Sequence, residues 1–212
     1  MMRIIVLIKE IPNLADSYVS KSQQTLIFNS PPILNPVDEN AIELALQLKE
    51  KNFGEVIAIG LGPEDLEIKL KDALAMGCDE AYHIMDPIFE GVNSLQTAII
   101  LNRAIKKLGP FDLIIAGSGS ITGNGGQVGI RVAEILNLNQ AINVKGVEIE
   151  ELNSPALITV LKDSNRPRIP TAVGIAKAAH KKLTRLTSSD LGMSQDDLEK
   201  TKAFDLVREY LS

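Results

Sequence analysis

The chain has 212 residues, of which 45% are hydrophobic, 23% are charged and 4% are aromatic. This composition is that of a folded globular protein, long enough for one large α/β domain with a small appendage. The formal net charge of −5 and the few aromatic side chains for base stacking argue against nucleic acid as a partner. The single cysteine, Cys78, excludes an internal disulfide and a cysteine metal cluster.

The first apolar run, Ile4 to Ile8, is interpreted as a buried strand rather than as a targeting segment. It is too short for the apolar region of a signal peptide, and Lys9 and Glu10 follow it directly. No other apolar run approaches the length of a membrane span. We therefore expect a cytoplasmic protein with no membrane span.

Strand and helix patterns then alternate along the chain. The expected strands are the apolar runs 56–62, 80–85, 113–116 and 156–161, a half-exposed run at 141–150 and a short strand at Thr25–Phe28. The expected helices run from the N-cap Asp38 to Lys51, from Pro63 to Gly77, from Ser94 to Leu108 and from Gln127 to Leu136, with further candidates at 173–183 and 196–211. This alternation predicts an α/β fold with a doubly wound, mainly parallel, Rossmann-like sheet. We assign residues 1–185 to this α/β domain and residues 186–212 to a C-terminal arm that packs on a partner subunit.

A glycine-rich loop lies between the expected strand 113–116 and the helix that starts at Gln127. A strand, a glycine loop and a helix together offer backbone N–H groups and a positive helix end to a phosphate. The loop matches neither G-x-G-x-x-G nor the P-loop pattern, so its spacing leaves a phosphate site and a merely flexible loop both open. Ligands of parallel sheets bind beyond the carboxyl ends of the strands, where Ile8–Lys9, Leu61–Pro63 and this loop should converge.

The remaining reactive side chains are interpreted as structural. His83 lies inside an expected strand and is taken as a packed core residue, and no serine or cysteine pattern forms a triad with it. Cys78 at a turn is taken as a small surface or core residue rather than a reactive thiol. Asp38 and Glu39 are explained by the start of a helix rather than as paired catalytic acids.

Several separated segments together resemble the β subunit of electron transfer flavoproteins. They are Ile5–Pro12, Leu34–Glu50, Ala73–Asp79, Phe111–Gly117, Gly123–Gly129 and Arg166–Pro170. They occur in the family's order and spread over most of residues 3–185, which makes them together far more specific than any one motif.

The resemblance implies a Rossmann-like fold of the adenine nucleotide alpha hydrolase-like type. It also implies a heterodimer with an electron transfer flavoprotein alpha-like subunit, which carries most contacts to a shared redox FAD. The β subunit itself holds AMP, or a second FAD in electron-bifurcating members. Such a chain is an electron carrier subunit rather than a catalyst by itself, and it shuttles electrons between dehydrogenases and an acceptor. Carried over to this sequence, the cofactor-binding residues are Ile8, Lys9, Asn35, Leu61, Gly123, Asn124, Gly125, Gly126, Gln127 and Val128.

Three departures from the family pattern keep alternatives open. Where the family loop usually reads Asp-Gly-Asp-Thr, residues 122–125 read Thr-Gly-Asn-Gly, so both acids are absent and Gly125 has no side chain to form a hydrogen bond with a phosphate. The segment Glu148–Pro155 is shorter than the family's hairpin region, and Ala172 stands where dehydrogenase-recognising members carry a leucine, so we expect a different electron partner. The alternatives are a stand-alone adenine-nucleotide-binding regulatory module without a redox role, and a scaffolding subunit with an empty site.

Overall fold

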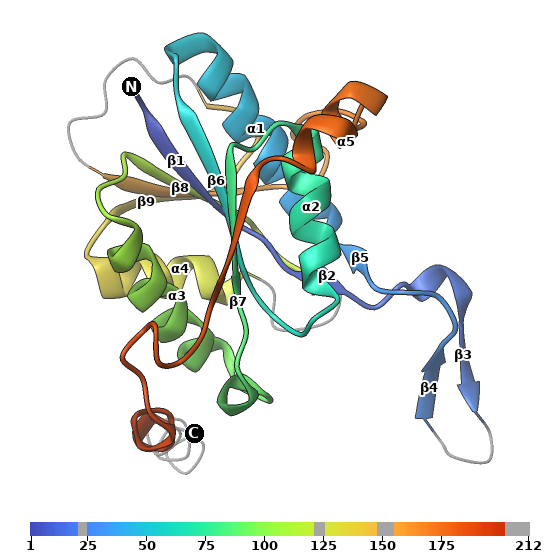
Figure 1. Ribbon diagram of the computed structural model, residues 1–212, viewed down its shortest axis with the longest axis vertical. Coiled ribbons are helices and arrows are strands. Elements are labelled where there is room, and N and C mark those ends of the chain that lie inside the picture. The colour runs from blue at the N-terminus through green and yellow to red at the C-terminus, as the bar shows by residue number, and fades with distance from the viewer. Residues whose placement is uncertain (21–24, 121–125, 148–154, 202–212) are drawn as a thin grey trace.

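The computed structural model describes residues 1–20, 25–120, 126–147 and 155–201 (Figure 1). In these ranges the centre of the protein is a seven-stranded sheet with the order β11-β7-β6-β1-β8-β10-β9. Every pair of neighbouring strands in it is parallel. The strands are β1 (Arg3–Leu7), β6 (Glu55–Leu61), β7 (Glu80–Ile84), β8 (Leu113–Gly117), β9 (Asn139–Val144), β10 (Ala156–Val160) and β11 (Lys182–Leu186).

Helices cover both faces of this sheet, as Figure 1 shows. One face carries α1 (Pro36–Asn52) and α2 (Leu66–Met76), with α5 (Ala172–Ala178) beside α2, and the other carries α3 (Ser94–Leu108) and α4 (Gln127–Leu136). Alternate residues of β1 enter the two cores, with Ile4 and Val6 toward α1 and α2, and Ile5 and Leu7 toward α3 and α4. Because successive side chains of a strand point to opposite faces, a strand buried on both faces must be a continuous apolar run. The predicted doubly wound α/β fold is confirmed.

Smaller elements connect β1 to α1. The chain forms β2 (Glu10–Ile11), η1 (Leu14–Asp16), β3 (Ser17–Ser20), β4 (Thr25–Phe28) and β5 (Ile33–Leu34), and the short helix η2 (Pro87–Phe89) precedes α3. The antiparallel pair β3–β4 projects away from the sheet in Figure 1. The strand expected at Thr25–Phe28 is confirmed, whereas its partner Ser17–Ser20 was not expected, since its polar sequence lacks a strand pattern of its own.

The structure corrects two helix predictions. Asp38 is not the N-cap of α1, because the helix begins earlier, with Asn35 as its N-cap and Pro36 in its first turn. Proline suits the first turn of a helix, because the N–H groups there have no intrahelical acceptor and the helix loses no hydrogen bond when one is absent. The helix expected at 173–183 ends at Ala178, and Lys182–Leu186 forms the edge strand β11, which pairs with β7. An edge strand is stabilised by this distant pairing, which its local sequence does not reveal.

The described part of the predicted C-terminal arm packs on its own domain. Leu191, Met193 and Leu198 are buried in the same core cluster as α3, and Gln96 Nε2 donates to the backbone oxygen of Leu198 at 2.8 Å. Residues 195–201 are helical, in agreement with the helix expected from 196, and residues 202–212 lie outside the described ranges. Packing of the arm on a partner subunit stays a prediction.

Candidate functional site

A cavity of about 650 Å³ opens where strands β1 and β8 end. The order of the chain reverses at this point, since β6 and β7 follow β1 on one side while β8 lies against its other side. In doubly wound sheets, ligands bind in the crevice at such a reversal of strand order. The volume also falls within the range of about 300–1,000 Å³ that is usual for ligand pockets.

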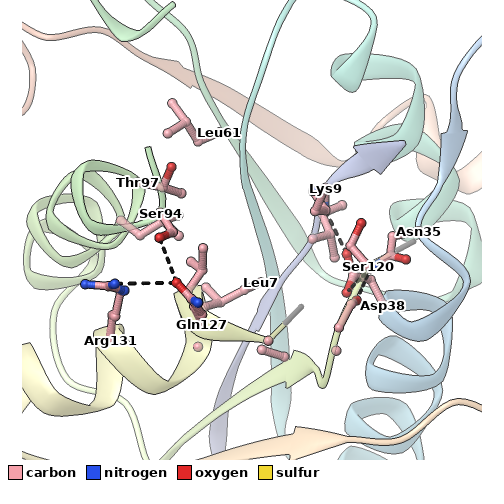
Figure 2. Close-up of a pocket in the computed structure, with 18 of the residues that line it drawn as sticks. Leu7, Lys9, Asn35, Asp38, Leu61, Ser94, Thr97, Ser120, Gln127 and Arg131 are labelled. Atoms are coloured by element: carbon pink, nitrogen blue, oxygen red, sulfur yellow. Dashed lines mark hydrogen bonds between the residues drawn. The ribbon is translucent and has the colours of Figure 1, made fainter. Parts of the chain in front are cut away.

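The structure brings the described members of the predicted site together around this cavity. Seven of the ten predicted residues line it: Ile8, Lys9, Asn35, Leu61, Gly126, Gln127 and Val128. The other three, Gly123, Asn124 and Gly125, lie outside the described residues. In Figure 2 Lys9 and Asn35 lie on one side of the cavity, and Leu61 and Gln127 lie on the other.

Sequence reasoning missed several polar residues of the cavity wall, namely Asp38, Ser94, Thr97 and Arg131. A signal for Arg131 was present, because it lies four residues after Gln127 and therefore on the same face of α4. A signal for Ser94 and Thr97 was their place at the start of α3, a helix that follows the carboxyl end of β7. Asp38 was noticed, but its position in the first turn of α1 was explained as capping.

The carboxylate of Asp38 is buried against the ends of β1 and β8. It accepts hydrogen bonds from the backbone N–H of Lys9 at 2.9 Å and from Nδ2 of Asn35 at 3.1 Å. Burial raises the pKa of Asp38 to about 7, although these hydrogen bonds and one from the Gly117 backbone act in the opposite direction. A Cβ at Gly117 would lie 2.3 Å from Oδ1 of Asp38, so this position accepts no side chain without a shift.

Asn35 joins the start of α1 to the loop that follows β8. Its Nδ2 donates to Oδ1 of Asp38 and to the backbone oxygen of Gly119 at 2.9 Å. Both partners are acceptors, which fixes the orientation of the amide group. Its Oδ1 is buried and has no hydrogen-bond partner within the described part of the chain. A buried acceptor without a partner costs about 1–3 kcal/mol.

Three helices begin at the cavity, and they differ in how their N-termini are capped. Asn93 and Gln96 form a reciprocal capping box at α3, with hydrogen bonds of 2.9 and 3.0 Å. The start of α1 carries Pro36, which has no N–H, and the carboxyl group of Asp38. The N-cap of α4 is Gly126, which has φ of 79° and no side chain to cap the helix. The first N–H groups of α4 are therefore the ones best placed to bind an anion.

A second polar group of residues lies between α3 and α4. The Oε1 atom of Gln127 accepts from Ser94 Oγ at 3.1 Å and from Arg131 Nη2 at 3.4 Å, as the dashed lines in Figure 2 show. Because both contacts come from donors, the Gln127 amide has a fixed orientation and keeps its Nε2 donor for other partners. The α4 side of the cavity therefore offers hydrogen-bond donors from a backbone, an amide and a guanidinium group.

The structural interpretations of His83 and Cys78 are confirmed. His83 is fully buried, and its Nε2 lies 3.1 Å from the backbone oxygens of both Gly62 and Pro63, so the protonated Nε2 donates to the turn after β6. Cys78 is also fully buried, and burial raises the pKa of its thiol to about 12, far from that of a reactive cysteine.

The described ranges contain neither a metal centre nor a membrane-spanning helix. No group of three or more His, Cys, Asp or Glu side chains there has an arrangement that could hold a metal ion. No helix there combines the length and apolar character that a membrane crossing needs.

Comparisons with known proteins agree with the resemblance in the sequence motifs. A family model described as the electron transfer flavoprotein domain matches residues 25–154. The chain is 38% identical to the electron transfer flavoprotein subunit beta of Thermoanaerobacterium thermosaccharolyticum, over 93% of this chain and 83% of that protein. It is 34% identical to the Caffeyl-CoA reductase-Etf complex subunit CarD of Acetobacterium woodii, over 92% and 82% of the two chains. It is 35% identical to the electron transfer flavoprotein subunit beta of Bacillus subtilis, over 79% and 72%. The chain therefore belongs to the electron transfer flavoprotein family, among its β subunits.

Proposed function

We propose that this protein pairs with a flavin-bearing α subunit, carries electrons in that complex, and holds an adenine nucleotide in its own cavity. Membership of the family supports the electron-transfer role. The observation that carries the nucleotide proposal is the meeting of Asn35, Leu61 and Gln127 in one cavity at the switch point of the sheet. The nucleotide is AMP or the adenosine diphosphate part of FAD. A cytoplasmic location belongs to the same proposal.

The uncapped start of α4 is the proposed phosphate site. The backbone N–H groups of its first residues, Gln127 to Gly129, form the positive end of a ten-residue helix. Gly126 has the positive φ that the tight turn into α4 requires, and a Cβ there would lie 2.3 Å from the backbone oxygen of Ser118. The close approach of the Ser118 backbone to the start of α4 thus depends on the absence of a Cβ at Gly126.

The adenosine part would lie along the remaining cavity wall. This wall contains the apolar side chains of Leu7, Leu61 and Val92, which suit the faces of a purine ring. The unsatisfied Oδ1 of Asn35 is a hydrogen-bond acceptor that matches the exocyclic amine of adenine. The residues present therefore fit an adenine nucleotide. When bound in the complex, the flavin supplies the electron chemistry, and this chain supplies the binding groups and their electrostatic surroundings.

A surface around α5 is the proposed contact for the redox partner. Ile169, Val173 and Ile175 are 85%, 63% and 58% exposed, and grouped apolar side chains on a surface are typical of interaction sites. The name of the Acetobacterium woodii relative places that protein in a complex with a reductase. Because Ala172 provides no large anchor at the start of α5, we propose a partner other than an acyl-CoA dehydrogenase.

Co-expression with the α-like chain of the same organism tests the proposal. We expect the two chains to elute together from a size-exclusion column with flavin absorbance, and mass spectrometry of the released ligands to find AMP or FAD beyond one FAD per complex. Asn35→Ala should reduce this second ligand, whereas Asn52→Ala, at the other end of α1, should retain it. A chain that stays monomeric and colourless and binds ATP tightly would overturn the redox role in favour of a regulatory module. A complex with no second nucleotide would overturn the nucleotide site alone.

A further inference from the structure

Arg131 is a half-buried cation on the cavity wall that has no acidic partner within the described part of the chain. Its one hydrogen bond there is the 3.4 Å contact with the neutral amide of Gln127. By contrast, Arg3, Arg168 and Arg185 each pair with a glutamate. A guanidinium group partly withdrawn from water without a counter-ion is unfavourable, so a negatively charged ligand is the missing partner that the cavity implies.

The guanidinium group of Arg131 is directed toward the start of α4. Side chains in a helix lean toward its N-terminus, and Arg131 lies one turn after Gln127, so its head group returns beside the first residue of the helix. The contact with Gln127 Oε1 confirms this direction, and Figure 2 shows the two side chains joined. Arg131 therefore stands next to the proposed phosphate site rather than in place of it.

The positive charge extends over more of the cavity than one phosphate occupies. The N–H groups at the start of α4 point along the helix axis, whereas Arg131 lies to the side of the helix that faces Ser94 and Thr97 (Figure 2). Among the described lining residues, Asp38 is the one acid, and it lies across the cavity beside Lys9 and Asn35. The α4 side thus combines a helix end and a planar guanidinium fork, with no opposing carboxylate among the described residues that line it.

We propose that the cavity prefers an adenosine diphosphate group to AMP, with Arg131 holding the second phosphate while the start of α4 holds the first. This inference rests on the proposed function, because it names the ligand class of the same site. A guanidinium group matches two phosphate oxygens at once, which gives a diphosphate an advantage that a monophosphate at the helix end does not gain. The diphosphate group belongs either to free ADP or to FAD.

Calorimetric titration of the nucleotide-free full-length chain with AMP, ADP, ATP and FAD tests this preference. We expect ADP and FAD to bind at least about 10-fold more tightly than AMP, the range of a charged hydrogen-bond pair. Arg131→Gln should remove most of this preference and leave the affinity for AMP within about 3-fold. Arg103→Gln makes the same change on an exposed residue of α3 outside the cavity and should alter neither affinity.

The outcomes separate this inference from the function on which it rests. Equal affinity of the unaltered chain for AMP and ADP would overturn the diphosphate preference and leave the nucleotide site intact. Tight binding of FAD with ADP as weak as AMP would assign the preference to the flavin part and overturn the role of Arg131. Binding of no adenine nucleotide would overturn both proposals. The ligand series on the unaltered chain decides these cases even if Arg131→Gln does not fold.

Discussion

Arg168 holds the buried carboxylate of Glu43 in a two-pronged ion pair, with Nε 2.8 Å from Oε2 and Nη2 3.1 Å from Oε1. The backbone N–H of Arg168 donates to the same carboxylate at 3.1 Å. One turn earlier on α1, Asn40 exchanges hydrogen bonds with Asn165. These contacts fasten the segment before α5 to the helix whose first residues form one wall of the cavity. The exposed apolar surface at α5 and the cavity are therefore built on the same helix.

Loss of the Arg168 side chain is expected to destabilise the protein through the carboxylate that it leaves behind. Burial raises the pKa of Glu43, but the hydrogen bonds from Arg168 outweigh this and hold it below its usual value. Arg168→Ala leaves this buried charge unpaired and should lower the free energy of unfolding by about 2–3 kcal/mol, since Arg168 is itself partly exposed. Glu50→Gln, which removes only the exposed partner of Arg168, should cost less than about 1 kcal/mol. Urea unfolding measures both values, and equal losses would contradict the buried pair as the main contact.

The stability of the protein is expected to fall as Asp38 loses its proton. Its pKa in the folded protein is about 7, whereas the ordinary value is 3.8. Between these values the folded state binds one more proton than the unfolded state, so stability decreases with rising pH by up to about 1.4 kcal/mol per unit. The Asp38→Asn variant lacks this titration. The stability of the unaltered protein relative to this variant should therefore fall from about pH 4.5 to pH 7 and then level off. Parallel pH profiles of the two proteins would show that folding does not raise the pKa of Asp38.

Gly117 is expected to tolerate no side chain, because a Cβ there would lie 2.3 Å from Oδ1 of Asp38. Gly117→Ala would displace the Asp38 carboxylate, lower the melting temperature and weaken adenine-nucleotide binding. We expect a loss of about 1–3 kcal/mol, the range for overpacking a well-packed site. Gly146→Ala is the matched control, since a Cβ at Gly146 meets no atom within 4 Å, and it should change stability by less than about 0.5 kcal/mol. A melting temperature that both variants share with the unaltered chain would refute the contact.

The two histidines are expected to differ sharply in their contribution to stability. His83 is fully buried and satisfies the backbone oxygens of Gly62 and Pro63 in the turn that follows Leu61. His83→Leu leaves both oxygens without this donor and should cost about 1–3 kcal/mol. The exposed His180 provides the control, and His180→Leu should have an effect within about 0.5 kcal/mol. Thermal unfolding of both variants makes the comparison, and a His83 variant as stable as the His180 variant would show that water replaces the lost hydrogen bonds.

Local sequence patterns were enough to predict the central strands and the helices on both faces. Buried parallel strands must be apolar throughout, so β1, β6 and β8 were recognisable from residue type alone. The predicted bounds of α3 were correct, and the structure shows that its start is set locally, since Asn93 and Gln96 cap it within four residues of sequence. The meeting of Lys9 and Leu61 with the start of α4 could also be expected, because the carboxyl ends of parallel strands share one edge of the sheet, whereas Asn35 was assigned to the site only from the family resemblance.

Contacts between distant segments decided the rest. Strand β11 exists because Lys182 and its neighbours pair with Glu80 and β7, 102 residues earlier, and five residues of an edge strand carry no pattern that reveals such a partner. The burial of Asp38, its raised pKa and the unsatisfied oxygen of Asn35 all arise where α1 packs against the ends of β1 and β8. Hydrogen bonds and dielectric surroundings depend on which atoms lie within a few ångströms, and only the folded chain brings those atoms together.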